Sequence, residues 1–186
     1  MRFLIRVQPA EVPGEKLLEF VKSVAKTLGA DPRNPKWTSF GALELDVFCP
    51  TRADLDLFIE AVKPIAKFEF VKDLNVAPPH REEVELFAEA RDLFNDERYW
   101  ECHEVLEGVW RTKQGEEKSL LQGIILVCAA FVHHQKGEET VALGVLGRAV
   151  RQLVYSGPVY AGFRVDELKR NVDEILQTRN FLNFII

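Results

Sequence analysis

The side chains best suited to chemistry are concentrated in one short segment, residues 99–111. His103 precedes Glu104 by one position and Glu107 by four, and Trp100 and Trp110 stand on either side of them. Side chains four positions apart meet on one face of a helix, so His103 and Glu107 could act on the same ligand. A helix that only covers a core does not need this density of polar and aromatic groups. We therefore treat the segment as the candidate site.

Histidine and carboxylate side chains can also hold a divalent metal. The pattern His103-Glu104-x-x-Glu107 differs from the zinc-protease motif, because Glu107 stands where that motif has its second histidine. A carboxylate-rich set suits Mn²⁺ or Fe²⁺ better than Zn²⁺. Three interpretations stay open: a structural His–Glu pair, a ligand or metal site using His103 and Glu107, and a catalytic site with Glu104 as general base.

The segment from 117 to 136 is apolar around nearly its whole circumference, which is typical of a buried central helix. Its polar exceptions include Gln122 and His133. If the chain turns near Gly115, Gln122 comes level with Glu107, and His133 comes close to Tyr99. Buried polar groups need partners, so we predict a polar seam with an aromatic rim, in which the candidate ligand-binding residues are Tyr99, Trp100, His103, Glu107, Trp110, Gln122 and His133.

Other groups have plainer interpretations. We expect Cys102 to be a buried, inert thiol, because it falls on the apolar side of its helix. Gly144 and Gly147 suit close helix packing. Arg148 and Arg151 could contact an anion, but we expect them to be solvated salt-bridge partners of the acidic surface.

The first eighty residues alternate between strand and helix periodicity. The strand at 42–48 alternates apolar and acidic residues, and Thr51 with Asp54 resembles a capping box for the next helix. Asp31 to Pro35 is predicted to be a loop because of its two prolines. The expected elements are a strand at 3–7, a helix at 14–28, a strand at 42–48, a helix at 51–62 and a strand from 68 to 71. This β-α-β-α-β order predicts a reduced ferredoxin-like layer.

The segment 75–80 has two prolines and no periodicity, so we place a domain boundary there. The predicted domains are a small α/β domain, 1–76, and an all-α helical bundle, 77–186. Helical periodicity predicts bundle helices near 81–95, 98–113, 117–136, 139–155 and 165–178. The fold class is therefore α+β with two domains.

Charge and composition exclude several classes of protein. Residues 1–80 hold equal numbers of basic and acidic residues, so the net charge of −5 falls entirely on residues 81–186. Neither part has the basic excess expected for nucleic-acid binding. Three scattered cysteines indicate a reducing compartment, and the apolar run from Gly123 to Val132 is too short to cross a membrane. We expect a cytoplasmic protein that self-associates through sheet edges.

The helical part resembles a known family, DUF309. The resemblance rests on Phe94, the run from Tyr99 to Glu107 with Trp110, the run from Leu121 to Ile125, and His133. It covers about residues 84–170 and leaves the α/β segment outside. It implies a compact helical domain of unknown function, and no reaction.

Two functions from different classes follow. The first is a non-enzymatic interaction or small-ligand-binding module, because one polar and aromatic seam stands without a complete catalytic constellation. The alternative is a metal-dependent hydrolase with His103 and Glu107 as ligands and Glu104 as general base. RNA binding through the small sheet is a third, weaker option, opposed by the zero net charge of that part.

Overall fold

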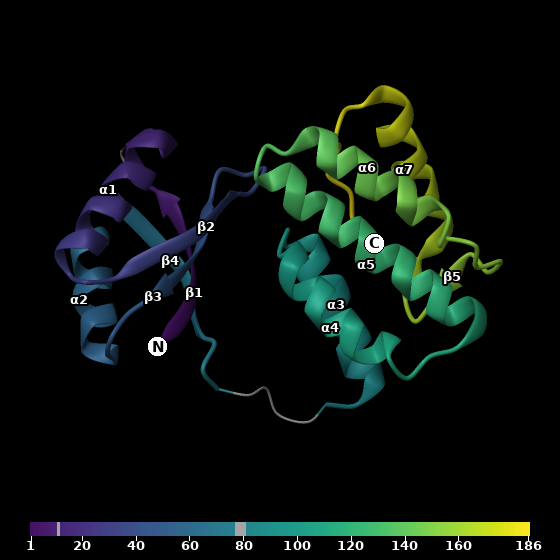
Figure 1. The fold of residues 1–186 in the computed structure, drawn as a ribbon, viewed down its shortest axis with the longest axis horizontal. Coiled ribbons are helices and arrows are strands. Elements are labelled where there is room, and N and C mark those ends of the chain that lie inside the picture. Colours follow the sequence, from purple (N-terminus) through teal and green to yellow (C-terminus); the bar gives the residue numbers. More distant parts are fainter. Residues whose placement is uncertain (11, 77–80) are drawn as a thin grey trace. The chain divides into compact units, whose positions relative to one another are not determined.

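The computed structural model describes residues 1–10, 12–76 and 81–186, and the chain divides into two compact units, Met1–Pro79 and His80–Ile186. The first contains a four-stranded sheet and two helices, and the second contains five helices and a short hairpin (Figure 1). The predicted α+β class is confirmed. The expected boundary between residues 76 and 77 adjoins 77–80, which lie outside the described residues, so the two-domain division stays a prediction.

The first unit has the order β-α-β-β-α-β, one strand more than predicted. Its elements are β1 Arg2–Pro9, α1 Gly14–Thr27, β2 Asp31–Trp37, β3 Leu43–Phe48, α2 Arg52–Val62 and β4 Ala66–Asp73. The sheet order is β2-β3-β1-β4, and every pair of neighbouring strands is antiparallel.

The prediction that Asp31 to Pro35 is a loop is wrong, because these residues begin β2. Proline has no backbone N–H to donate, so it disrupts a central strand, which hydrogen-bonds to a neighbour on each side. β2 is an edge strand that pairs only with β3, and its register is irregular between Arg33 and Lys36. An edge can therefore accept Pro32 and Pro35, and the proline signal was misleading here.

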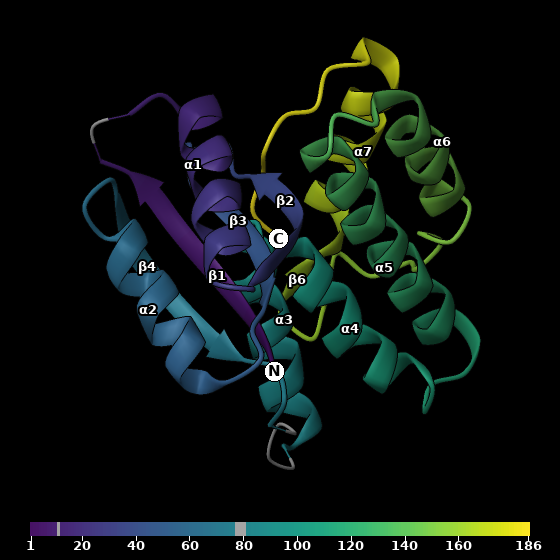
Figure 2. The same ribbon diagram turned by 60° about the vertical axis from the view of Figure 1, so that its left-hand side comes forward.

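Helices α1 and α2 cover one face of this sheet (Figures 1 and 2). Alternate residues of β3 supply the core, as the sequence pattern predicts: Leu43, Leu45 and Val47 are buried in one apolar cluster with Leu17 of α1 and Phe58 of α2. The predicted capping box also forms at the start of α2, where the Thr51 hydroxyl accepts a hydrogen bond from the Asp54 N–H at 3.2 Å.

The opposite face of the sheet carries a buried ion cluster. The Glu44 carboxylate lies 3.0 Å from Arg6 Nη2 and 2.7 Å from Lys36 Nζ. The Arg6 guanidinium also lies over the rings of Phe40 and Phe70, at 5.6 and 5.2 Å from their centroids. The polar face of β3 at Glu44 is therefore covered by side chains of the same unit, and the Glu44 carboxylate is buried.

The second unit consists of α3 Glu83–Asn95, α4 Tyr99–Trp110, α5 Gly115–Gln135, α6 Glu139–Val150 and α7 Val165–Thr178, with β5 Val159–Tyr160 and β6 Phe163–Arg164 between α6 and α7. All five predicted helices are present. The short hairpin qualifies the all-α prediction: Ala161 and Gly162 both have positive φ angles, as a two-residue type I′ turn requires.

The central helix of this unit is α5, with α4 and α6 packed along it (Figures 1 and 2). Its run from Gly123 to Ile125 and the side chains of Val127, Cys128 and Phe131 are buried, which confirms the prediction of a central helix. No helix of the described residues is both long and apolar enough to cross a membrane.

Candidate functional site

Helix α4 is held by its apolar stripe. Tyr99, Cys102, Leu106 and Val109 recur every three or four residues and are buried in the core of the helical unit. At the start of the helix, Arg98 makes a bidentate pair with Glu101, with Nε and Nη2 each 2.6 Å from a carboxylate oxygen. This anchoring leaves the neighbouring face, with His103 and Glu107, half-buried at the edge of the core.

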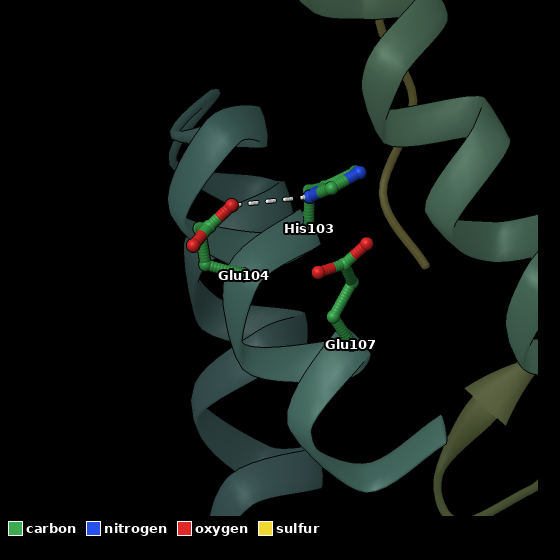
Figure 3. A group of neighbouring side chains, drawn as sticks. All are labelled: His103, Glu104 and Glu107. Carbon is green, nitrogen blue, oxygen red and sulfur yellow. Dashed lines mark ion pairs between the residues drawn. The ribbon is translucent and has the colours of Figure 1, made fainter. Parts of the chain in front are cut away.

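The structure brings His103, Glu104 and Glu107 together as a metal-capable group. Each offers one ligand atom, and the three atoms lie within 4.8 Å of one another. In Figure 3 the Glu107 carboxylate lies beside the His103 ring, and Glu104 approaches the ring from the other side, with its Oε1 3.5 Å from His103 Nδ1. This distance is that of an ion pair, and Nδ1 is a buried atom without a hydrogen-bond partner.

The group is closed on one side by an aromatic ring. Trp100 is 47% exposed, and its ring stacks on His103 with centroids 5.3 Å apart and planes 6° apart. Glu107 reaches Arg111, 3.6 Å away, which is the surface pair expected from their four-residue spacing. All of these residues lie on α4 or at its C-terminal cap, Arg111, so their arrangement follows from α4 alone.

Two predicted members of the polar seam have partners elsewhere. The Tyr99 hydroxyl donates to Asn183 Oδ1 at 3.5 Å, and burial raises the pKa of Tyr99. His133 Nδ1 pairs with the carboxylate of Glu138, just beyond the end of α5. The structure therefore does not bring Tyr99 and His133 into the group around His103.

Gln122 and Trp110 belong to a different feature, an open hollow of about 610 Å³ where α5 lies between the end of α4 and α6. Its lining is Trp110, Lys118, Ser119, Gln122, Leu126, Arg148, Arg151 and Gln152. We call this feature the α4–α6 hollow. Lys118 places its ammonium group 4.4 Å from the centroid of the Trp110 ring. Two of the predicted ligand-binding residues, Trp110 and Gln122, therefore line this hollow.

Sequence reasoning missed most of this hollow. Lys118 was not singled out, and Arg148 and Arg151 were assigned to surface salt bridges in preference to an anion contact. A signal was available: neither arginine has an acidic residue three or four positions away on its helix. The three-residue spacing of the two arginines places them on one side of α6, but only the packing of α6 against α5 brings them to Gln122.

The cysteine beside His103 is not available as a nucleophile. Cys102 is fully buried, and its Sγ accepts a hydrogen bond from the Cys128 thiol at 3.4 Å. Burial, with the neighbouring Cys128 thiol, raises the pKa of Cys102 well above its usual value. A thiolate is the reactive form, so Cys102 is a buried thiol that is not poised for nucleophilic attack, as expected.

Comparisons with known proteins concern the helical unit. Residues 87–145 match the family model described as "Domain of unknown function (DUF309)". The match lies within the helical unit and confirms the family resemblance predicted from the motif around His103.

An uncharacterized protein of Aquifex aeolicus (strain VF5) is 26% identical over 102 residues, 54% of this chain and 31% of the relative. The chain thus spans about a third of the length of this curated relative. A crystal structure of a conserved hypothetical protein from Thermus thermophilus is 33% identical, covers 49% of this chain and 95% of that one, and has a TM-score of 0.44.

Proposed function

We propose that the helical unit is a non-enzymatic small-ligand-binding module whose site is the α4–α6 hollow. The observation that carries this proposal is the lining of the hollow. Its volume of about 610 Å³ falls within the range of roughly 300–1,000 Å³ typical of small-molecule sites. Trp110 and Leu126 supply apolar surface, and Ser119, Gln122 and Gln152 supply hydrogen-bonding groups. None of these three polar side chains has a hydrogen bond within the described residues.

Filling the hollow tests this proposal. Ser119→Trp introduces a large ring into its wall, whereas Gln177→Trp introduces the same ring at an exposed position of α7. A chemically mixed set of small molecules is screened by ligand-observed NMR against the wild-type chain and both variants. We expect the compounds that bind the wild type to compete with one another. Their binding should be lost in Ser119→Trp and kept in Gln177→Trp. Compounds that bind both variants equally, or none that bind the wild type, would contradict the proposal.

A second candidate function is a metal-dependent hydrolase at His103. It is supported by the three potential ligand atoms within 4.8 Å and by the buried Nδ1 of His103, which has no hydrogen-bond partner. His103 and Glu107 would be ligands, and Glu104 would serve as general base. Because all three belong to one helix, most of the coordination sphere would be left to water or substrate, as catalytic metal sites require.

Metal analysis of protein purified without chelator tests this second candidate. The hydrolase proposal expects stoichiometric Mn or Fe that is lost in His103→Ala and kept in His134→Ala. His134 is a matched control because it is also half-buried and paired with a glutamate, Glu139, at 2.7 Å. A metal-free protein whose unfolding temperature ignores added divalent ions would exclude the metal site.

We further propose a cytoplasmic location and a ferredoxin-like first unit. The location is supported by three free cysteines. The ferredoxin-like assignment is supported by the β-α-β-β-α-β order and the antiparallel sheet. Redox-state labelling of the cysteines in intact cells would contradict the location if it found them oxidised.

Self-association is also part of the proposal, through the β4 edge of the sheet. Among the described residues, β4 pairs only with β1, and it carries no proline, whereas the β2 edge is interrupted by Pro32 and Pro35. Unpaired edges favour strand addition. Light scattering over a concentration series should show a dimer, and a monomer at every concentration would exclude this part of the proposal.

A further inference from the structure

The α4–α6 hollow is positively charged, although the helical unit is acidic. Lys118 from α5 and Arg148 and Arg151 from α6 and its end contribute three cations to its lining. No carboxylate of the described residues lines it. Since residues 81–186 carry the whole net charge of −5, a lining with only positive side chains departs from the rest of this unit.

These cations are not neutralised by the protein. Arg148 and Arg151 make no ion pair or hydrogen bond through their guanidinium groups within the part of the chain that the structure describes. Two other basic side chains of the unit are paired, by contrast: Lys113 lies 2.6 Å from Glu83, and Arg98 is bound by Glu101. The surface salt bridges that the sequence suggested for Arg148 and Arg151 are therefore not formed.

The positions of the polar groups favour one chemical class. Guanidinium groups bind phosphate oxygens through paired, charge-assisted hydrogen bonds. Ser119, Gln122 and Gln152 add neutral donors around the same space, and Trp110 with Leu126 form an apolar wall. A ligand that satisfies the whole lining has a doubly charged head and a small apolar body.

We propose that the hollow binds a small organic phosphate monoester, with the phosphate at Arg148 and Arg151 and the apolar body along Trp110 and Leu126. Lys118, held over the Trp110 ring, adds a third positive charge to the lining. This inference rests on the proposed ligand-binding function and specifies its ligand class.

Calorimetric titration of the full chain with three probes tests the proposal. Phenyl phosphate carries both parts of the ligand, inorganic phosphate carries only the anion, and phenol carries only the ring. We expect phenyl phosphate to bind at least roughly ten-fold more tightly than either other probe. Phenol lacks the charge-assisted hydrogen bonds, each worth about a factor of ten or more, and inorganic phosphate lacks the ring whose burial along Trp110 and Leu126 favours binding. Added salt should weaken this binding.

A charge-matched pair of variants locates the effect. Arg148→Gln with Arg151→Gln should weaken phenyl phosphate binding about ten-fold or more. Lys136→Gln with Arg170→Gln removes the same charge from exposed positions outside the hollow and should change it by less than about two-fold. Circular dichroism verifies that both variants fold.

The outcomes separate this inference from the proposed function. If phenol and phenyl phosphate bind equally tightly, and Ser119→Trp abolishes the binding of both, the phosphate inference is overturned. The proposal of a ligand-binding module then still stands. Equal losses in the two charge variants would likewise overturn the phosphate inference. Absence of phenyl phosphate binding would also overturn it, whereas the broader screen with Ser119→Trp decides the module independently.

Discussion

Glu44 shows how a polar strand position can hold a unit together. Its carboxylate serves two cations, Arg6 and Lys36, and the Glu44 and Arg6 side chains are only 3% and 2% exposed. Removing one partner of a buried pair leaves the other charge buried without compensation, which costs about 3–5 kcal/mol. We expect Glu44→Ala to lower the free energy of unfolding of the first unit by about that amount, measured by urea denaturation.

The neighbouring carboxylate offers a matched control. Glu69 lies 4.0 Å from Arg6 Nη1, and its side chain is 32% exposed. Exposed pairs contribute about 0–1 kcal/mol, so Glu69→Ala should change the stability by no more than that. Equal losses in the two variants would show that burial of the Glu44 pair does not decide its contribution.

Because the Tyr99 hydroxyl is buried, we expect the folded protein to lose stability at alkaline pH. Burial raises the pKa of Tyr99 above its usual value of 10, so its full contribution is present below pH 10 and is lost as the pH rises toward the folded-state pKa. At pH 11 the unfolded tyrosine is ionised and the folded one is not, which destabilises the fold by about 1.4 kcal/mol.

Tyr99→Phe removes this ionisation and keeps the ring contacts with Phe94 and Phe131. The variant should be less stable than the wild type by no more than about 1 kcal/mol at pH 8, and the difference should shrink or reverse at pH 11. Urea denaturation at both pH values measures it. A difference that is the same at pH 8 and pH 11 would contradict the assignment.

At the scale of elements, the contact between α5 and the end of α6 depends on one glycine. A Cβ at Gly123 would lie 2.6 Å from Leu153 Cδ2 and 3.2 Å from the Leu153 backbone nitrogen. The expectation that Gly144 and Gly147 are the close-packing positions is wrong, because a Cβ at either meets nothing within 4 Å. Close packing therefore belongs to Gly123 of the central helix, and not to the glycines of α6.

The two kinds of glycine should respond oppositely to alanine. Overpacking costs about 1–3 kcal/mol, and alanine in a helix regains up to about 1 kcal/mol, so Gly123→Ala should lower the free energy of unfolding by about 1–2 kcal/mol. Gly144→Ala keeps only the gain and should raise it by about 0.5–1 kcal/mol. Thermal unfolding of both variants checks this, and a stabilised Gly123→Ala would contradict it.

At the scale of the whole molecule, the two units have separate hydrophobic cores with no buried residue in common. A domain with its own core can fold alone, so we expect fragments 1–76 and 77–186 each to unfold cooperatively in urea. The unfolding of the full chain should then be the sum of two transitions. A fragment that gives the NMR spectrum of an unfolded chain would refute the two-domain prediction.

The sequence alone determined features whose cause is local. Hydrophobic periodicity located α3 to α7, the alternation of β3 placed Leu43 and Leu45 in the core, and spacing along α4 joined His103 to Glu107. In these cases neighbours along the chain decide the structure. The sequence missed β2, because prolines interrupt a central strand but not an edge strand, and only the sheet determines which strand lies at an edge.

Only the tertiary structure decided which distant groups meet. Tyr99 contacts Asn183, and Gln122 lines the α4–α6 hollow together with Arg148 and Arg151. Each outcome depends on how whole helices pack and on which side chains satisfy buried polar groups, and no periodicity along the chain specifies that. The motif around His103 was visible in the residues, whereas the cationic hollow required α5 and α6 to be brought together.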